Sequence, residues 1–402
     1  MRSQRAVKCL SKHSRLLTPF ITQSGKPDWV SFMIQPNSIE ERLDRQAPAV
    51  FIMPAVLIVL FFSIFPLIVS LFVALSRLKF VKGGIQAKFI GTLNFKKLLF
   101  GSQQYHFLGK FDQLTLLGYF LIGVFLIITI FWLYKYLRSG HSSIGGTIGR
   151  LVVATGMFFL TLLAIINLTT PKGLPGTLVV TLIYVILGVI IQYIIGLGLA
   201  MLCVQNIKGR NFFRMVFFIP MMITPVGIAY LFRMLTDMTK GPFAPIIMWL
   251  GMEESSWAVI PWGARIAVMI GDAWQWIPFM FIVLLAGLES LSPEQKEAAV
   301  IDGAGKWQIF RDITWPTLLP VSVTIILIRL IEAFKIIDLP NVMTNGGPGI
   351  ATESLSLHSY FNWRTMDLSG SAAVGYLLML VAVFICLSFL SLVKNRVEIA
   401  QK

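Results

Sequence analysis

The fold class of this chain is decided by residues 177–203, which read TLVVTLIYVILGVIIQYIIGLGLAMLC. No charged side chain interrupts the stretch, and Leu, Ile and Val would lie on every side of a helix rather than along one stripe. A helix of about 20 mostly apolar residues is long enough to cross the hydrocarbon core of a bilayer. We therefore predict a membrane-spanning helix here.

Other apolar stretches of the same kind extend this prediction along the chain. Of its 402 residues, 56% are hydrophobic and 13% are charged, whereas a soluble domain has about 45–50% apolar and about 25% charged residues. The ten-residue alternation of an outer-membrane barrel is absent. The sequence predicts an all-α polytopic membrane protein with about eight transmembrane helices: 49–76, 114–134, 151–168, 177–203, 212–235, 264–288, 317–338 and 372–393.

The net charge of +15 is read as loop asymmetry around a bilayer, and no nucleic-acid partner is expected. Placing the N-terminus inside puts 20 Lys and Arg residues in inner segments and 10 in outer loops. Both termini are therefore predicted to be cytoplasmic. One loop disagrees, because 77–113 would lie outside with seven basic residues.

Cysteine and histidine are too sparse and scattered to indicate a metal site. Cys9, Cys203 and Cys386 form no CxxC pair, and none of the four histidines belongs to an HExxH motif. The basic N-terminus is not followed at once by an apolar run, so a cleaved secretory signal is not expected.

The predicted inner loop 289–316 reads ESLSPEQKEAAVIDGAGKWQIFRDITWP. Ser292 and Gln295 have the spacing of a capping box, and Pro293 suits the first helical position. We expect a helix over 293–301, a turn at Asp302-Gly303, a second amphipathic helix over 306–313, and a new span opened by Pro316. An amphipathic hairpin on the membrane surface with no partner would show the same pattern.

The order Glu297-Ala298-Ala299, Gly303 and Ile313-x-x-Pro316 resembles the EAA loop of ATP-binding-cassette importer permeases. Trp315 departs from the usual leucine of that loop. Trp274–Phe279 and Thr344–Leu355 also resemble the maltose-type carbohydrate branch, as does Asn211-Phe212-Phe213-Arg214 with Ile219-Pro220.

The resemblance is dense over 177–393, looser over 46–76 and largely lost over 77–176. It implies a six-helix type I permease core with two extra helices. The expected organisation is a cytoplasmic extension 1–48, a first core helix 49–76, an outer loop and inserted helix pair 77–176, a core 177–393 containing the loop 289–316, and a cytoplasmic tail 394–402.

In such importers the EAA loop couples the permease to ATPase subunits. The residues that the resemblance assigns to coupling are Glu297, Ala298, Ala299, Asp302, Gly303, Ala304, Ile313 and Pro316. Expected partners are a second permease subunit in a heterodimer, two ATPase subunits, an extracytoplasmic substrate-binding protein, a carbohydrate and the lipid bilayer. The implied location is the bacterial inner membrane.

Gly303-Ala304-Gly305-Lys306 is only a weak match to a phosphate-binding loop, because the glycine spacing is wrong and no Ser or Thr follows Lys306. The chain is therefore expected to be non-catalytic and to hold no cofactor. ATP and Mg²⁺ would be bound by the partner ATPases.

Polar residues within the spans indicate a substrate pocket, because buried ionisable groups in a membrane are costly. Two helical faces combine polar and aromatic or small side chains, as sugar recognition requires. Together with the resemblance, they give the candidate substrate-binding residues Asp272, Gln275, Trp276, Phe279, Arg329, Ala333 and Ile336.

Structural interpretations of the same residues stay open. Arg329 and Glu332 could form an ion pair, Lys335 and Asp338 a pair or gate near the outer end, and Trp274 and Trp276 an interfacial belt. Single polar residues such as Gln192 are typical of helix–helix hydrogen bonds.

The predicted function is the permease of an ATP-binding-cassette importer for an oligosaccharide or sugar derivative. Arg329 and the basic outer loop raise the hypothesis of an acidic cargo, whereas a neutral one is the family's commoner case. The alternative is a secondary transporter driven by an ion gradient, in which Asp272 or Glu332 would relay ions. No nucleophile–base pair indicates a membrane enzyme.

Overall fold

The computed structural model describes residues 51–111, 113–138, 144–169, 174–205, 208–237, 240–242, 244–249 and 260–400. The expected extension 1–48 lies outside these residues, as do 170–173, 250–259 and the last two residues of the tail. The chain forms two compact units, 1–69 and 70–402. Each is described by itself.

The first predicted span is a helix over Phe51–Ala74. It contains a π-helical turn, η1 (Leu60–Ile64), and continues as α4 (Phe65–Ala74). Pro66 has no N–H to donate to the preceding turn, and the wider turn accommodates this loss, since Phe65 N–H bonds the Leu60 carbonyl instead.

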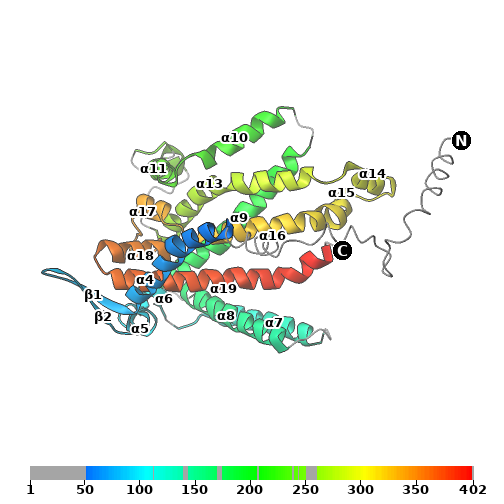
Figure 1. Cartoon of the computed structure of the whole chain (residues 1–402). Helices are drawn as coiled ribbons and strands as arrows, with labels where there is room; N and C mark the ends of the chain where they lie inside the picture. The colour runs from blue at the N-terminus through cyan, green and yellow to red at the C-terminus, as the bar shows by residue number, and fades with distance from the viewer. Residues whose placement is uncertain are drawn as a thin grey trace, which may run out of the picture. The chain divides into compact units, whose positions relative to one another are not determined.

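The helix pair expected within 77–176 corresponds to α7 (Leu116–Leu137) and α8 (Ile144–Thr169), which pack side by side (Figure 1). Thr115 caps α7 by accepting a hydrogen bond from the Gly118 N–H at 3.3 Å. Both helices are long and apolar enough to cross a membrane, so the prediction of two spans in this region is confirmed.

Four long helices enclose the largest apolar core of the second unit. They are α9 (Thr177–Cys203), α13 (Pro261–Glu289), α16 (Trp315–Ala333) and α19 (Leu368–Ala400). Val185, Met280 and Leu284 are among its fully buried members. Gly196 allows α9 to approach α13 closely, because an added Cβ would lie 2.5 Å from Met280 Cβ.

The prediction of one continuous span over 212–235 is wrong. The segment is split into α10 (Arg210–Met222) and α11 (Pro225–Leu235), bent by 98°. Pro225 disfavours a helical conformation at Thr224, which is extended and whose hydroxyl accepts a bond from the Gly227 N–H at 3.3 Å. A new helix therefore begins at Pro225.

The prediction of a separate second helix over 306–313 is also wrong. Short α15 (Lys306–Ile309) passes through a π-helical turn, η2 (Phe310–Thr314), directly into α16, so that 306–333 is one helical run. The wider turn, in which Trp315 N–H bonds the Phe310 carbonyl, absorbs the donor missing at Pro316. Pro316 therefore lies inside a helix rather than at its start.

Within the described residues, seven helices are long and apolar enough to cross a membrane, or eight if the bent pair counts as one span, which agrees with the predicted fold class. Figure 1 shows α14 (Pro293–Ile301) at one end of the second unit. The opposite end carries a β-hairpin, β1 (Ser76–Val81) and β2 (Gly84–Phe89), and four short helices: α5 (Leu93–Phe100), α6 (Gln104–Leu108), α17 (Asp338–Thr344) and α18 (Leu355–Arg364). The two-residue strands β3 (Gly109–Lys110) and β4 (Leu174–Pro175) pair with each other. A further short helix is α12 (Ala244–Trp249).

Candidate functional site

The helix α14 has the bounds expected from the sequence, and it ends in a Schellman motif. Gly303 has a φ of +80°, its N–H bonds the Val300 carbonyl at 3.0 Å, and the Ala304 N–H bonds the Ala299 carbonyl at 2.9 Å. Asp302 is the C-cap. Gly303 is required here because side chains rarely adopt this backbone conformation.

The expected capping box at the start of α14 is not formed. The Ser292 hydroxyl donates to the Glu294 carboxylate instead of accepting from the helix backbone, and no side-chain cap bond is made. This contact lowers the pKa of Glu294, chiefly through the hydroxyl hydrogen bond.

Most of the predicted coupling residues lie at the surface of this loop. Glu297 and Ala298 are exposed on α14, while Ala299 is half-buried. Three large apolar side chains are exposed beside them: Val300 at 61%, Ile301 at 85% and Trp307 at 70%. Ile313 and Pro316 lie farther along, half-buried at η2 and the start of α16. The loop therefore exposes these apolar side chains together with the carboxylates of Glu294, Glu297 and Asp302.

The second cluster predicted from the sequence is a buried polar network between three helices. Arg329 on α16 forms an ion pair with Asp272 on α13, and its Nε donates to Gln192 Oε1 on α9 at 2.7 Å. Gln192 Nε2 in turn donates to Asp272 Oδ2 at 2.7 Å. Arg329 is only 1% exposed. A buried charge is costly unless it is paired and hydrogen-bonded, and the charges of Arg329 and Asp272 are both.

A cavity of about 240 Å³ lies beside this network. Five of the seven predicted pocket residues line it: Asp272, Gln275, Trp276, Arg329 and Ile336. The other two do not. Ala333 is buried in the apolar core, and Phe279 packs edge-on against Trp276, with ring centroids 5.9 Å apart.

The structure corrects the predicted partners of these charges. Arg329 forms an ion pair with Asp272 and not with Glu332. Lys335 forms an ion pair with Glu332, at 2.7 Å, and not with Asp338. The Arg329 guanidinium lies 4.5 Å from the Trp276 ring centroid, so one face of that ring is already occupied. Gln192, expected to bond between helices, does so.

The segment between α17 and α18 is fixed to the core by hydrogen bonds. Arg265 Nε on α13 donates to the Ala351 carbonyl at 2.6 Å, and the Tyr184 hydroxyl on α9 donates to the Thr352 carbonyl at 3.2 Å. The Leu355 N–H donates to Thr181 Oγ1 at 2.8 Å. The Thr344–Leu355 stretch noted in the sequence therefore builds a rigid cap over α9 and α13.

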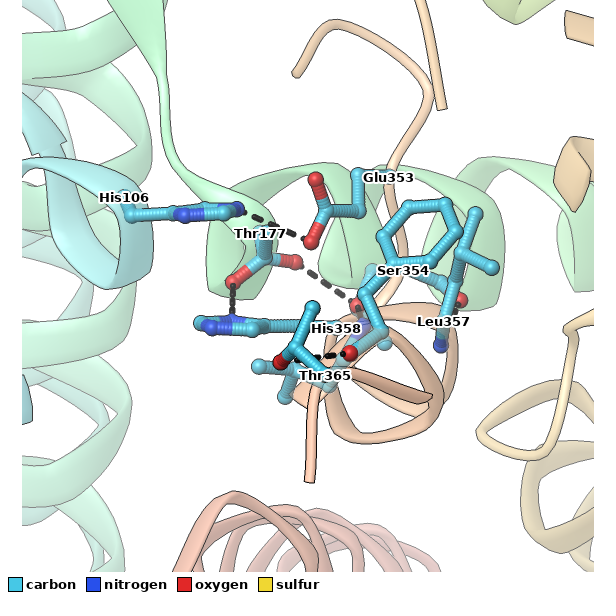
Figure 2. A network of polar contacts seen from close by, with 10 residues as sticks. His106, Thr177, Glu353, Ser354, Leu357, His358 and Thr365 are labelled. Atoms are coloured by element: carbon cyan, nitrogen blue, oxygen red, sulfur yellow. Dashed lines mark hydrogen bonds and ion pairs between the residues drawn. The ribbon is translucent and has the colours of Figure 1, made fainter. Parts of the chain in front are cut away.

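A cluster that sequence spacing did not reveal joins the inserted region to this cap. Figure 2 shows His106 of α6 and His358 of α18 one above the other, with Glu353 and Thr177 beside them. The two imidazole rings stack at 4.2 Å with an interplanar angle of 7°. His106 Nε2 lies 2.8 Å from Glu353 Oε1, and His358 Nδ1 lies 3.2 Å from Thr177 Oγ1.

His106, Glu353 and His358 each offer one ligand atom within 4.8 Å of the others. Two imidazoles and a carboxylate form a zinc-type donor set. However, the in-plane lone pairs of two stacked, nearly parallel rings lie in separate parallel planes and cannot both point at one metal ion. The arrangement therefore fits a hydrogen-bonded tether, in which burial and the neighbouring His106 lower the pKa of His358 from 6.5 to about 3.

Comparison with known proteins decides the family. Residues 192–399, which include α13, α14 and the polar network's Asp272 and Arg329, match the model described as binding-protein-dependent transport system inner membrane component. The chain belongs to this family.

Relatives of this inner membrane component are transport permeases. The trehalose/maltose transport system permease protein MalF of Thermococcus litoralis is 33% identical over 210 residues, which cover 52% of this chain and 70% of that protein. The sulfoquinovosyl glycerol transport system permease protein SmoG of Agrobacterium fabrum is 29% identical, covering 50% of this chain and 66% of that one.

A solved structure shares the fold. A chain of a bacterial alginate ABC transporter in complex with an alginate-bound periplasmic protein superposes with a TM-score of 0.50 and 20% identity, covering 69% of this chain and 95% of that chain. The expected architecture of an importer permease is thus confirmed, while the inserted helices α7 and α8 lie before the matched family region.

Proposed function

We propose that this chain is the permease subunit of an ATP-binding-cassette importer that forms the translocation path for a carbohydrate. One observation carries the proposal. The exposed helix α14, which carries the Glu297-Ala298-Ala299 sequence and ends in a Schellman motif, lies at one end of the second unit. The chain belongs to the binding-protein-dependent permease family. Relatives named for trehalose/maltose and arabinooligosaccharide transport support a carbohydrate cargo.

In this proposal α14 is the coupling helix. Exposed Val300, Ile301 and Trp307 would be costly in water and are suited to a groove on a partner subunit. Glu297 supplies a polar anchor, and the Schellman motif at Gly303 fixes the turn that leads from α14 to α15. Because α15 and α16 form one helical run, a pull on α14 is transmitted directly into a core helix.

The cavity beside Arg329 is the proposed site of cargo contact during alternating access. Two of its polar groups, Gln275 and Asp338, make no hydrogen bond or ion pair within the described part of the chain. Its two cations, Arg329 and Lys335, both have carboxylate partners. A cavity whose cations are already paired favours a neutral, hydroxyl-bearing cargo over an acidic one.

The partners follow from the family. The proposed complex contains a second permease, two ATPases and an extracytoplasmic binding protein, with this chain itself non-catalytic and both termini cytoplasmic. The ion-driven alternative is disfavoured because Asp272 and Glu332, its candidate relays, are both engaged by cations.

Purification of the tagged chain from native membranes tests the proposal. Mass spectrometry of the purified material should find a chain with a phosphate-loop motif and a second permease. A Glu297→Lys variant should lose the ATPase while keeping the second permease. Recovery of this chain alone, under conditions that preserve other membrane complexes, would contradict the proposal.

A further inference from the structure

The outer end of the second unit carries an unusual concentration of positive charge. Between residues 76 and 111 there are seven Lys and Arg residues and no Asp or Glu. All seven are exposed, and none forms an ion pair within the described residues. Six of them form what we call the basic platform: Arg77, Lys79, Lys82 and Lys88 of the hairpin, with Lys96 and Lys97 of α5.

The hairpin register places like charges together. Arg77 lies directly opposite Lys88, an arrangement that is unfavourable unless an anion lies nearby. Because side chains alternate along a strand, Lys79 lies on the same face as Arg77. The fold thus holds three cations on one face of a two-stranded ribbon that has no third strand to stabilise it.

The base of the hairpin is nevertheless firmly anchored. The Leu78 N–H donates to Ser369 Oγ at 3.0 Å, and the buried Asn94 side chain donates to the Ala74 and Ser76 carbonyls at 2.8 and 2.9 Å. The outer half presents Phe80, Val81 and Ile85 at 49–59% exposure. The fixed base therefore holds the basic and apolar side chains of the tip in an exposed position.

A cavity of about 290 Å³ lies at the base of the platform. Arg77, Lys79 and Lys97 line it with a single carboxylate, Asp367. Asp367 Oδ1 already accepts from the Gly370 N–H at 2.9 Å at the start of α19. Three cations therefore face a cavity whose only acidic group is engaged, which suits a carboxylate from another molecule.

The platform lies on the side away from the proposed coupling helix. Figure 1 shows β1 and β2 extending beyond the ends of α18 and α19, at the end opposite α14. A surface that extends past the helix ends can be reached by a soluble protein. Positive charge in a translocated loop also opposes the usual bias, so its retention calls for a function.

We propose that the basic platform is the docking surface for an acidic face of the extracytoplasmic binding protein, with one partner carboxylate entering the cavity lined by Arg77, Lys79 and Lys97. This inference rests on the proposed importer function. It assigns the platform to steering and affinity for the protein partner, and it leaves cargo selection to the cavity near Arg329.

The test uses the complete transporter, reconstituted with its ATPases and second permease. The probe is the solute-binding protein that stimulates its ATP hydrolysis. The variant Lys79→Gln/Lys88→Gln removes two platform charges, Lys79→Arg/Lys88→Arg keeps them, and Lys110→Gln removes a basic residue off the platform. The stimulated rate is measured against binding-protein concentration at low and high salt.

Two lost surface charge pairs should raise the KM for the binding protein about tenfold in the Gln variant at low ionic strength. The maximal and basal rates of ATP hydrolysis should stay unchanged in the Gln variant. The KM for the binding protein should stay unchanged in the two control variants. The difference should shrink below about twofold at about 0.5 M salt, where charges are screened within a few ångströms.

An unchanged KM in the Gln variant would overturn the proposal. The proposal would also be overturned if the Gln variant changed only the cargo concentration that gives half-maximal stimulation at saturating binding protein. The platform cations would then act on the cargo and not on the binding protein. Failure of the importer function itself looks different, since the unmodified transporter would then show no stimulated hydrolysis.

Discussion

Arg329 is a fully buried cation, and its tolerance in the core depends on two partners from other helices. Asp272 supplies the opposite charge and Gln192 an acceptor, while Trp276 covers the guanidinium. The sequence indicated polar faces on both spans, but not this pairing. Asp272 and Gln192 lie 57 and 137 residues away along the chain, and helical periodicity carries no information across such separations.

Neutralising Arg329 should expose the cost of this arrangement. In Arg329→Met, Asp272 loses its cation, and breaking a buried pair costs about 3–5 kcal/mol. The double variant Asp272→Asn/Arg329→Met should recover most of that loss, because neither charge remains. Thermal unfolding in detergent checks both. A double variant whose loss equals the sum of the two single losses would show that the pair is not coupled.

Gly303 is the second position where one residue decides the outcome. Gly303→Pro imposes a negative φ where +80° is needed and removes the N–H that bonds Val300. The variant should assemble in the membrane, but the transporter that contains it should hydrolyse ATP without moving cargo. Gly303→Asn is the matched control, because Asn tolerates a left-handed backbone and nothing lies within 4 Å of its Cβ. Normal transport by the proline variant would contradict the coupling role of α14.

At the scale of elements, the sequence predicted spans better than it predicted their breaks. The bounds of α9 and α14 were correct because an uninterrupted apolar run and a Ser-Pro start with a glycine stop are strong local signals. The 98° bend at Thr224-Pro225 and the fusion of α15 with α16 through η2 were missed. In both places proline has two allowed outcomes, a break or a wider turn, and tertiary packing selects between them.

The tether between α6 and α18 gives a pH prediction at the same scale. His358 has a folded pKa of about 3, against 6.5 when unperturbed. The unfolded chain therefore binds a proton as pH falls below about 6.5, whereas the folded chain does not until about pH 3. The free energy of unfolding should decrease across that window as pH falls.

Melting temperatures from pH 7.5 to 5 measure this effect. His358→Asn keeps a polar group near Thr177 without titrating, so its melting temperature should depend less on pH than that of the unmodified chain. His106→Gln, which alters the half-buried partner of the stack, should keep most of the dependence. An equally steep decrease in His358→Asn would show that burial of His358 is not its cause.

At the scale of the whole molecule, the number of membrane spans and the position of the permease core could be predicted directly from the sequence. Hydrophobic length gives the number of spans, and a short loop motif together with the family match identifies the permease core. The inserted pair α7 and α8 was visible as two further apolar runs. The His106–Glu353–His358 tether was not, because its members meet only after the inserted region folds against the cap.

The two ends of the second unit differ in the charge of their exposed side chains. At one end of the second unit, exposed apolar side chains accompany the carboxylates of α14, and the unpaired basic platform lies at the other end. In the importer model these ends meet different partners, an ATPase and a binding protein. The lining of the cavity at Arg329 includes residues of α13 and α16. The helical run 306–333, which contains α16, follows α14 along the chain.

The most direct test of the importer model is uptake of a labelled oligosaccharide by proteoliposomes that contain the complete transporter. With the binding protein present on the side of the basic platform, uptake should require hydrolysable ATP on the side of α14 and should persist when ionophores collapse proton and sodium gradients. Uptake that continues without ATP and stops when the ion gradient is collapsed would contradict the model.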